Sequence, residues 1–511
     1  MPAKTLMVQG TASSVGKSIM VAGLCRILRQ DGLKVAPFKA QNMALNSFVT
    51  IEGGEIGRAQ AVQAEAAGIP PSVDMNPVLL KPEADARSQV VVLGKAVKNL
   101  DANQYYRYTP ELLPIIEDSL NRLRAAYDVV VIEGAGSPAE INLKKKEIVN
   151  MRVARLADAP VLLVGDIDRG GVFASLVGTL ELLTTKERAF VKGFVINKFR
   201  GDLKLLKPGL RALERQTDKP VLGVIPYFRD ITISQEDSVY LDERQVTSIN
   251  GNPDVAVIRL PHISNYDDFD PLEQQGCNLR YVTFPAELGT PDLLILPGTK
   301  TTIADLTYLQ QNGLANAIRL LAKADVPIIG ICGGHQILGT SILDPENVES
   351  NQERIDGLGL LRVITTFDGT KTTKQVTARV VSDTGLFAGL MDMNVSGYEI
   401  HMGQTTNLDC QPALRVLHVP EGDYFDGAVS PNGLIFGTYI HGLFHNTEFT
   451  HQLLSNLRQI RGLSPVRNVP INREKMYDKL ADIIRSNLDM TLLYEITFGK
   501  EKFGHFAGYD T

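Results

Sequence analysis

The sequence predicts an α/β protein made of two successive domains, each built around a mainly parallel sheet. Three observations predict this class. An apolar strand runs into a Gly-rich turn and a helix at the start of the chain. Short apolar runs alternate with helical stretches through the first half, and a second such alternation begins near residue 255. Continuous apolar runs are typical of strands that are buried on both faces between helices.

The composition narrows the class of protein further. With 511 residues, the chain is long enough for two to four domains. Its formal net charge of −6 argues against a nucleic-acid-binding protein. Four scattered cysteines without Cys-x-x-Cys spacing indicate reduced thiols. No apolar run reaches membrane-spanning length, and the first strand leaves no room for a signal peptide. We therefore expect a cytoplasmic protein that binds neither nucleic acid nor membranes. No pattern specifies its oligomeric state.

The first strand, turn and helix have the pattern of a phosphate-binding loop. The turn reads Gly-Thr-Ala-Ser-Ser-Val-Gly-Lys-Ser, and it would place Gly10, Thr11, Gly16, Lys17 and Ser18 around a nucleotide, which we expect to be ATP. Lys17 would neutralise the β- and γ-phosphates, and the Ser18 hydroxyl would ligate Mg²⁺. Five residues separate the two glycines, where the usual loop has four. The alternative interpretation is an ordinary turn between strand and helix.

Polar residues follow the next predicted strands at their carboxyl ends, where sheets of this class bind ligands. Glu133 and Asp166 each follow a strand, and carboxylates beside a phosphate loop predict Mg²⁺ ligands together with Ser18. The alternative is that both acids cap helices or turns. Asn197 follows another strand, where it either reads the adenine edge or caps a turn. The strands of this domain after the first are expected at 35–38, 129–132, 160–164, 194–196 and 221–225.

Several polar residues in the first half are candidates for contact with a substrate. The segment that follows the second strand supplies most of them, and the full set is Lys39, Gln41, Asn42, Asn46 and Arg58. A basic run follows Glu133. It and Lys81 are weaker candidates for an anionic substrate, since a solvated helix face is the ordinary outcome for such a run. The basic residues of the run are Lys144, Lys145, Lys146 and Arg152.

The regular alternation weakens between residues 230 and 253, where polar residues, Gly and Pro gather. We therefore expect one domain over residues 1–235, a second over 252–450 and a helical extension over 451–511. The strands of the second domain are expected to include 255–258, 279–282 and 293–296.

The second domain centres on the run Pro-Ile-Ile-Gly-Ile-Cys-Gly-Gly-His-Gln, in which an apolar strand ends at Cys332. Glycines two residues before and two after the cysteine predict a nucleophile elbow, with the thiol pushed out at a helix N-terminus, where thiolate is favoured. The N–H of Gly333 would bind an oxyanion, with a second donor from the turn at Gly298. A buried structural cysteine is the alternative, but it does not explain the local glycines. We predict that Cys332 is a nucleophile.

A thiol nucleophile needs a base, and His441 is the best placed of the eight histidines because it ends the strand 434–440. His335 lies one helical turn past the cysteine and is expected to pack structurally. His441 and His445 have the i,i+4 spacing of zinc ligands, but no third ligand is evident.

With these motifs in place, the chain resembles the cobyric acid synthase family, glutamine-hydrolysing amidotransferases of cobalamin biosynthesis, over nearly its whole length. The first half is similar to the dethiobiotin-synthetase-like branch of phosphate-loop proteins, whose loop also has five residues between glycines. The second half is similar to class I glutamine amidotransferases. The discriminating stretches are Pro37-Phe-Lys-Ala-Gln-Asn-Met-Ala-Leu-Asn-Ser47, Glu55-Ile-Gly-Arg-Ala-Gln60, Gly397-Tyr-Glu-Ile-His-Met-Gly403 and Tyr439-Ile-His-Gly-Leu-Phe444.

The resemblance implies an ATP- and glutamine-dependent ligase that amidates the b, d, e and g carboxylates of adenosylcobyrinic acid a,c-diamide. Its partners would be the small molecules glutamine, ATP and an adenosylated corrinoid. The alternatives are cobyrinic acid a,c-diamide synthase or another ATP-dependent carbon–nitrogen ligase of the same fold. A partition-type ATPase would lack the cysteine elbow. A scaffold with a decayed glutaminase domain would not need Cys332 and His441.

One position departs from the wider class I pattern. Those glutaminases usually carry His-x-Glu, in which the glutamate orients the base, and this chain has Leu443 at that place. The cobyric branch shares the leucine. We therefore predict a Cys332–His441 pair and assign no third member of a triad.

Overall fold

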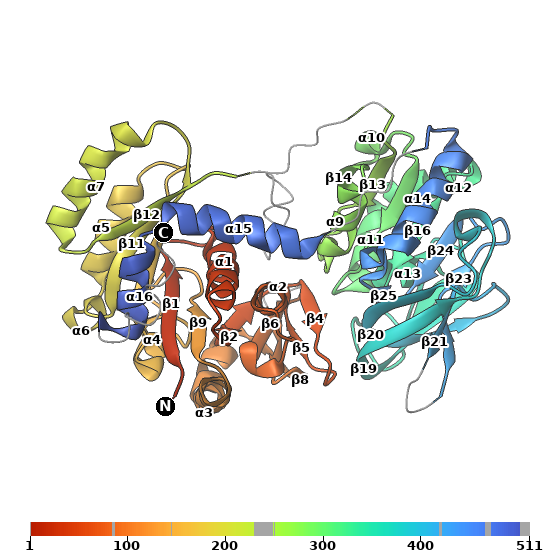
Figure 1. Ribbon diagram of the computed structural model, residues 1–511. Coiled ribbons are helices and arrows are strands. Elements are labelled where there is room, and N and C mark those ends of the chain that lie inside the picture. The colour runs from red at the N-terminus through yellow and green to blue at the C-terminus, as the bar shows by residue number, and fades with distance from the viewer. Residues whose placement is uncertain are drawn as a thin grey trace.

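The computed structural model describes residues 2–83, 87–144, 146–228, 249, 251–417, 422–465 and 472–500. This part of the chain forms two α/β domains that lie side by side (Figure 1), so the predicted class is confirmed. Most of the predicted boundary between residues 235 and 252, and Lys145 of the basic run, lie outside the described residues.

The N-terminal domain is built on a parallel sheet in the order β12-β11-β10-β1-β9-β2. The apolar runs that predicted its strands are buried, as strands between two helical layers must be. Its strands are β1 (Lys4–Gly10), β2 (Val35–Phe38), β9 (Val129–Glu133), β10 (Val161–Asp166), β11 (Val191–Phe199) and β12 (Val221–Pro226).

Helices cover both faces of this sheet, because successive strand residues point to opposite sides. On β1, Leu6 and Val8 pack in the cluster under α1, whereas Met7 packs in the cluster under α3, α4, α5 and α7. The helices of this domain are α1 (Lys17–Gln30), α2 (Arg58–Ala67), η1 (Val73–Met75), α3 (Ala102–Ala126), α4 (Met151–Ala157), α5 (Val172–Leu182), α6 (Thr185–Arg188) and α7 (Leu203–Thr217).

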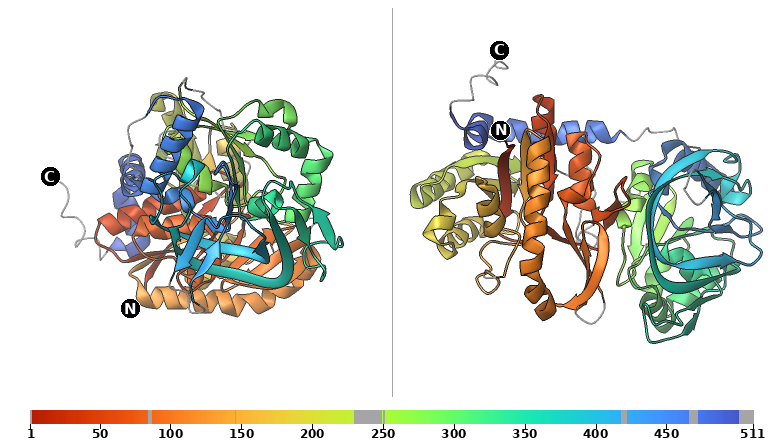
Figure 2. Two further views of the ribbon diagram at one scale, coloured as in Figure 1. Left: turned by 90° about the vertical axis from the view of Figure 1, so that its right-hand side faces the viewer. Right: turned by 90° about the horizontal axis from the view of Figure 1, so that it is seen from below.

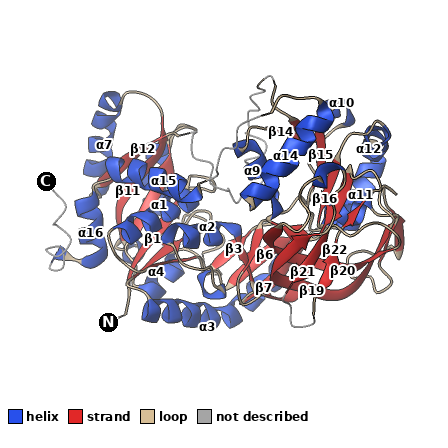
Figure 3. Cartoon of the chain, turned by 45° about the vertical axis from the view of Figure 1, so that its right-hand side comes forward, coloured by secondary structure: helices blue, strands red, loops and turns tan. Residues whose placement is uncertain are grey.

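Between β2 and α3 the chain forms two small sheets that the sequence did not predict. One has the strand order β3-β6-β7-β8, and the other is the hairpin β4-β5. Figure 3 shows the first of these sheets at the side of the domain that faces its neighbour. Their strands are β3 (Gln41–Met43), β4 (Ser47–Val49), β5 (Glu55–Gly57), β6 (Val78–Pro82), β7 (Arg87–Val92) and β8 (Lys95–Asp101).

The C-terminal domain has its own sheet in the order β14-β13-β15-β16-β24-β23, parallel except for the edge strand β23. The predicted strands at 255–258, 279–282 and 293–296 are confirmed. The strands are β13 (Asp254–Ile258), β14 (Asn278–Val282), β15 (Leu293–Leu296), β16 (Ile328–Ile331), β23 (Ala428–Val429) and β24 (Ile435–Thr438). Its helices are η2 (Tyr266–Phe269), α9 (Asp270–Gln274), α10 (Pro285–Leu288), α11 (Thr302–Gln311), α12 (Leu314–Lys323), α13 (Gly333–Leu338), η3 (Gly385–Phe387), η4 (Leu443–His445) and α14 (Thr447–Arg461).

A second, mixed sheet lies beside the parallel one in the order β18-β17-β19-β20-β25, with β21 attached to β19 and β22 attached to β21. Its long strands β19 and β20 pair over most of their length. The strands are β17 (Ser341–Leu343), β18 (Arg354–Asp356), β19 (Val363–Val380), β20 (Asn394–Asn407), β21 (Leu414–Leu417), β22 (Tyr424–Asp426) and β25 (Ile440–His441).

The last part of the chain is helical, as expected, but it divides between the two domains. Leu453 and Leu457 of α14 belong to the core of the second domain, so the expected limit at residue 450 falls inside this helix. Helices α15 (Arg473–Asn487) and α16 (Met490–Phe498) return to the first domain, where Leu480 and Ile484 pack against α1. Figure 2 shows this return along the first domain.

The hairpin β4-β5 joins the two domains. Lys371 on β19 pairs with the buried Glu55 at 2.5 Å, and Lys81 pairs with the other oxygen of Glu55 at 2.6 Å. Phe48 and Val49 pack against Tyr398 of β20. A buried carboxylate that two cations share holds the domains in one orientation. In the described chain, no helix is long and apolar enough to cross a membrane.

Candidate active sites

The phosphate loop stands where the sequence placed it, between β1 and α1. Gly16 caps α1 with φ of 99°, and a Cβ at this position would lie 2.2 Å from Asn197 Nδ2, so only glycine fits. No side chain caps the helix, and its first turn carries no acid. The first N–H groups of α1 are therefore available to an anion, which the helix dipole also favours.

The other predicted nucleotide residues surround this loop. The Lys17 ammonium donates to the carbonyl oxygens of Ala12 at 2.9 Å and Gly136 at 3.3 Å. Thr11 N–H donates to the carbonyl of Val164 on β10. Asn197 Nδ2 donates to the carbonyl of Val15 at 2.8 Å and so braces the loop from β11. Its predicted contact with a nucleotide stays a prediction.

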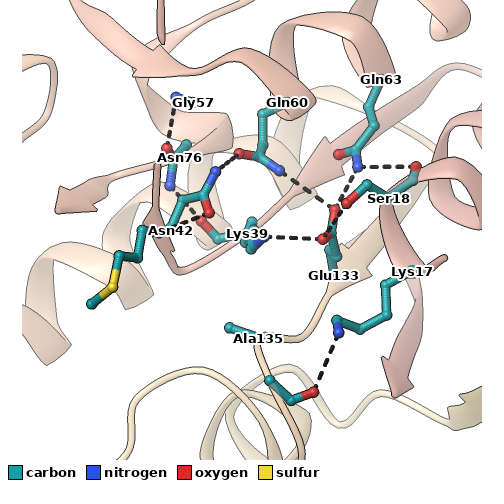
Figure 4. A network of polar contacts seen from close by, with 12 residues as sticks. Lys17, Ser18, Lys39, Asn42, Gly57, Gln60, Gln63, Asn76, Glu133 and Ala135 are labelled. Carbon is teal, nitrogen blue, oxygen red and sulfur yellow. Dashed lines mark hydrogen bonds and ion pairs between the residues drawn. The ribbon is translucent and has the colours of Figure 1, made fainter. Parts of the chain in front are cut away.

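Glu133 is the centre of a polar network beside the loop (Figure 4). Its Oε1 accepts from the Ser18 hydroxyl at 2.8 Å and from Lys39 Nζ at 3.0 Å. Its Oε2 accepts from Gln63 at 2.5 Å and from Gln60 at 3.5 Å. The end of β9, the start of α1, the end of β2 and helix α2 therefore meet at one carboxylate.

The surroundings of Glu133 keep it ionised. Burial alone would raise its pKa, but the charge of Lys39 and hydrogen bonds from Gln63, Lys39 and Ser18 hold the pKa below its ordinary value. A hydroxyl and a charged carboxylate in contact form an oxygen donor pair that suits Mg²⁺, which proteins usually hold with one or two carboxylates together with substrate phosphates.

Asp166, the other predicted Mg²⁺ ligand, has a different set of contacts. Its Oδ2 lies 2.8 Å from Lys198 Nζ, and its Oδ1 accepts from the amide of Asp168. Lys198 in turn donates to the carbonyl of Ser14 in the loop. The structure thus brings Ser18 and Glu133 together and links Asp166 to the far side of the loop.

The predicted substrate residues fall into two groups. Lys39 and Asn42 belong to the Glu133 network, since Asn42 Nδ2 donates to Gln60 Oε1 at 2.9 Å. Gln41 accepts from the Tyr105 hydroxyl. Asn46 is buried, and its carbonyl accepts from the amide of Arg58.

Arg58 itself points away from this network. It is only 2% exposed, and its Nε lies 2.7 Å from Asp267 Oδ2 in the second domain. The structure therefore gives Arg58 a partner across the domain interface, and its predicted contact with a substrate stays a prediction.

In the second domain, Cys332 stands at the predicted elbow. Its backbone has φ of 51° and ψ of −110°, a conformation that costs energy for any residue except glycine. A Cβ on Gly334 would lie 2.0 Å from the carbonyl of Leu296, so the helix that follows packs directly against β15. This is the sharp turn from strand to helix that the glycine spacing predicted.

The predicted oxyanion donors lie beside the thiol. A Cβ on Gly333 would stand 3.2 Å from Thr299 N, so the turn after Gly298 approaches the elbow closely. Asp305 holds this turn, because its Oδ2 accepts from the Thr299 hydroxyl at 2.5 Å. The oxyanion role of Gly333 and Gly298 stays a prediction, which this geometry supports.

His441 reaches the thiol from the end of β24 through β25. Its ring is buried and stacks on Tyr398 with centroids 5.4 Å apart. Its Nδ1 forms a hydrogen bond with Asp268 Oδ2 at 2.6 Å. Burial lowers the pKa of the imidazole, but the charges of Asp268 and Cys332 and hydrogen bonds to both outweigh burial and raise it to about 10. The predicted cysteine–histidine pair is therefore in contact.

His335, which follows the elbow, packs in the interior, the role that the sequence indicated. His335 is buried and packs edge-on against Tyr439 with centroids 5.4 Å apart. Among the residues that the structure describes, no group of three or more His, Cys, Asp or Glu side chains is arranged to hold a metal ion.

The motif Gly-Tyr-Glu-Ile-His-Met-Gly, on β20, forms the wall behind Cys332. The carbonyl of Ile400 lies 3.5 Å from Cys332 Sγ, and the carbonyl of Met402 accepts from Gln336 at 2.9 Å. A cavity of about 600 Å³ opens in front of this wall. Cys332 and His441 line it together with residues of the first domain, which are Lys81, Glu83, Arg87, Gln89 and Asn99.

Comparison with known proteins matches both halves of this architecture. Residues 6–239 match the model of the CobQ/CobB/MinD/ParA nucleotide-binding domain, and residues 254–449 match the CobB/CobQ-like glutamine amidotransferase domain. A cobyric acid synthase of Dehalococcoides mccartyi (strain CBDB1) is 57% identical over 97% of this chain and 99% of its own length. The chain belongs to the cobyric acid synthase family.

Further members of the cobyric acid synthase family show the same near-complete overlap. The protein of Sorangium cellulosum is 54% identical over 97% of this chain and 99% of its own. Among solved structures, PurLQS from Thermotoga maritima matches 41% of this chain and 99% of its own, with a TM-score of 0.32 and 20% identity. As a member of this family the chain is a glutamine-dependent ligase with a nucleotide-binding domain.

Sequence reasoning missed some residues at the Cys332–His441 site and in the Glu133 network. Asp268 has no local signal, because 173 positions separate it from His441. Tyr398 lies in a motif that the sequence singled out, yet its ring contact with His441 needed the pairing of β20 with β25. Gln63 lies one helical turn after Gln60, and this spacing on α2 was the available signal for its place in the Glu133 network.

Proposed function

We propose that this chain amidates the b, d, e and g carboxylates of adenosylcobyrinic acid a,c-diamide, with glutamine as the nitrogen source and ATP as the activating substrate. The observation that carries the proposal is the shared cavity. The nucleophile and its base open onto a space that the synthetase domain also lines, so ammonia released at Cys332 enters a region common to both domains.

At the glutaminase site, His441 takes the proton of the Cys332 thiol, and the sulfur attacks the side-chain amide carbon of glutamine. The N–H groups of Gly333 and the Gly298 turn stabilise the oxyanion. His441 then returns the proton to the departing nitrogen, and ammonia leaves. Water hydrolyses the thioester, which releases glutamate and restores the thiol.

At the synthetase site, a corrinoid carboxylate attacks the γ-phosphorus of ATP, and ADP leaves with the electron pair. Lys17 and the N–H groups of α1 stabilise the charge on the transferred group. Ammonia then attacks the acyl carbon, and phosphate departs to leave the amide. Lys39, held by Glu133, presents a buried cation beside the loop and is a further donor to the phosphoryl oxygens.

A divalent cation fits this site, because Ser18 and Glu133 supply adjacent oxygen donors. Bound there, Mg²⁺ would neutralise phosphate charge. The residues of the chain do the rest: Lys39 and Gln63 hold the Glu133 carboxylate in a fixed orientation, so the donor pair is formed before any ligand arrives.

The proposal is tested by incubating the protein with the corrinoid diamide, ATP and amide-¹⁵N-glutamine, and by following corrinoid mass. Four successive ¹⁵N amidations, each dependent on ATP, are expected. If the corrinoid a,c-diamide stays unchanged while cobyrinic acid itself is amidated, the substrate assignment is wrong.

Glu133→Gln is expected to raise the Mg²⁺ concentration needed for half-maximal amidation by at least about 10- to 100-fold, the loss typical of a disturbed metal shell. Asp166→Asn is expected to have a smaller effect, since Asp166 contacts Lys198. The corrinoid KM should change less than the Mg²⁺ requirement in both variants.

The measurement is a Mg²⁺ titration of initial rates. Asp128→Asn is the matched control, because Asp128 lies just before β9, at the opposite end of the strand that carries Glu133. An unchanged Mg²⁺ dependence in Glu133→Gln would contradict the metal-ligand assignment and leave Glu133 with a structural role.

A further inference from the structure

Both oxygens of Asp268 are committed to the segment that carries the catalytic base. Oδ2 lies 2.6 Å from His441 Nδ1, and Oδ1 accepts from the backbone amide of Gly442 at 2.8 Å. The His441 ring and the carboxylate are both buried. Two contacts on adjacent residues therefore fix the position of the carboxylate beside His441.

We propose that Asp268 is the positioning residue for His441, and that the synthetase domain holds this carboxylate in place. A glutamate two residues after the histidine is the usual orienting group in the glutaminases that this domain resembles. Here Leu443 occupies that place, and it is a buried hydrocarbon side chain without a hydrogen-bonding group. Asp268 reaches Nδ1 of His441 from the short helix η2, which lies far from His441 along the chain.

The contact selects the tautomer that the reaction needs. A carboxylate can only accept, so Nδ1 of His441 is the donor to Asp268. Nε2 is then left to take the proton of Cys332. The negative charge of Asp268 also stabilises the imidazolium that forms when the thiol is deprotonated, as the orienting acid of a catalytic triad does.

An ion pair from the other domain supports the loop that carries Asp268. Its neighbour Asp267 is fully buried and lies 2.7 Å from Nε of Arg58, at the start of α2. Burial and the charge of Asp268 raise the pKa of Asp267, and Arg58 opposes this rise. Arg58 of the synthetase domain is the cation in ion-pair contact with Asp267, and the charges of Arg473 and His441 also lower the pKa of Asp267.

A ring of hydrogen bonds makes a second connection between the domains at this loop. The backbone amide of Ser47 donates to Asn265 Oδ1 at 3.0 Å, and Asn265 Nδ2 donates to the Tyr398 hydroxyl at 3.1 Å. The hydroxyl of Tyr398 donates back to the Ser47 carbonyl at 3.2 Å, and its ring stacks on His441. His441 therefore has Asp268 at its Nδ1 and Tyr398 against its ring face, and Ser47 of the hairpin β4-β5 helps to position Tyr398.

The inference rests on the proposed glutaminase function, which the unaltered protein tests separately by releasing glutamate from glutamine. Asp268→Asn keeps the shape of the side chain but offers an amide to His441. We expect the kcat for glutamine hydrolysis to fall about 10²- to 10⁴-fold with a small change in KM, as loss of the tautomer-selecting acid does elsewhere. Amidation from ammonium should persist.

A titration distinguishes positioning from a general structural role. The His441 pKa of about 10 should fall in Asp268→Asn, measured by NMR of ¹³C-labelled histidine and assigned with His441→Gln. The other charged or titratable groups facing the ring stay in place: Cys332 from the elbow, Asp267 from η2, and His401 and Tyr398 from β20. Asp254→Asn is the matched control. Asp254 stands at the start of β13, at the opposite end of the sheet, and its carboxylate pairs with Arg280 of β14.

Arg58→Gln tests the contribution of the synthetase domain without touching the carboxylate. We expect about a tenfold loss of glutamine-dependent turnover, with the corrinoid KM measured in ammonium unchanged. A raised corrinoid KM with full glutamine hydrolysis would show that Arg58 serves the substrate and would overturn this part of the proposal.

Full glutamine hydrolysis and an unmoved His441 pKa in Asp268→Asn would overturn the positioning role. The positioning role would also be overturned if amidation from glutamine and amidation from ammonium fell equally in a folded variant, that is, one with the unfolding temperature of the unaltered protein. If Asp268→Asn does not fold, Asp268→Glu decides. Its longer acid should retain more than about a tenth of the glutaminase rate, and a rate as low as that of His441→Gln would contradict the proposal.

Discussion

Replacing Cys332 by alanine is expected to abolish amidation from glutamine, by about 10⁴-fold or more, and to leave amidation from ammonium. The thiol is the only nucleophile assigned at the elbow, and its task is to release ammonia. At high pH ammonium chloride supplies free NH₃, which reaches the acyl phosphate without the glutaminase. His441→Ala should behave similarly but less completely, because an unassisted thiol is still partly ionised at neutral pH.

The decisive assay is corrinoid amidation by Cys332→Ala, run once with glutamine and once with ammonium chloride. Cys410→Ala is the matched control, because Cys410 is another cysteine of the same domain whose sulfur accepts from the amide of Arg362, beside the loop after β20. Undiminished use of glutamine would refute the nucleophile assignment. Loss of both activities in a folded variant would mean that the two sites cannot act separately.

Lys17→Ala is expected to abolish amidation with either nitrogen source. A cation aimed at a transferred phosphoryl group contributes about 10³-fold or more to the rate, and no acyl phosphate means no electrophile for ammonia. Lys17 already points over the loop, where its ammonium donates to two backbone carbonyls. Glutamine hydrolysis at Cys332 should survive, since the lysine belongs to the other domain.

Rates of amidation and of glutamate release, measured in parallel, check this expectation. Lys4→Ala is the matched control, because Lys4 is exposed at the opposite end of the same strand β1. Synthesis from ammonium at the normal rate in Lys17→Ala would show that the phosphate site lies elsewhere.

Both motifs that carry the chemistry were predictable because each is local. In the phosphate loop, Gly16 and Lys17 are neighbours, and the positive φ of Gly16 is a requirement of the turn itself. At the elbow, the signal is the glycine spacing around Cys332, although Gly333 and Gly334 are required by close contacts with the chain at residues 296–302. The parallel strands were predictable for a similar reason, since burial on both faces leaves a continuous apolar run.

The small sheets and the mixed sheet were not predictable in this way. Strand β8 carries two lysines, the exposed part of β19 is rich in Thr and Lys, and neither shows a long apolar run. Their pairing depends on partners far along the chain. The hairpin β4-β5 has three-residue strands, and its position is set by its contact with β20.

By itself, the sequence determined the fold class and located the phosphate loop, the elbow at Cys332 and its predicted base His441, because each is marked by a short run of neighbouring residues. Only the tertiary structure decided that Asp268 meets His441 and that Arg58 pairs with Asp267. Such contacts join side chains from separate loops and domains. A buried charge without a partner is strongly destabilising, so each of these groups is paired. Which partner it meets depends on how the elements pack, and no local sequence pattern indicates that.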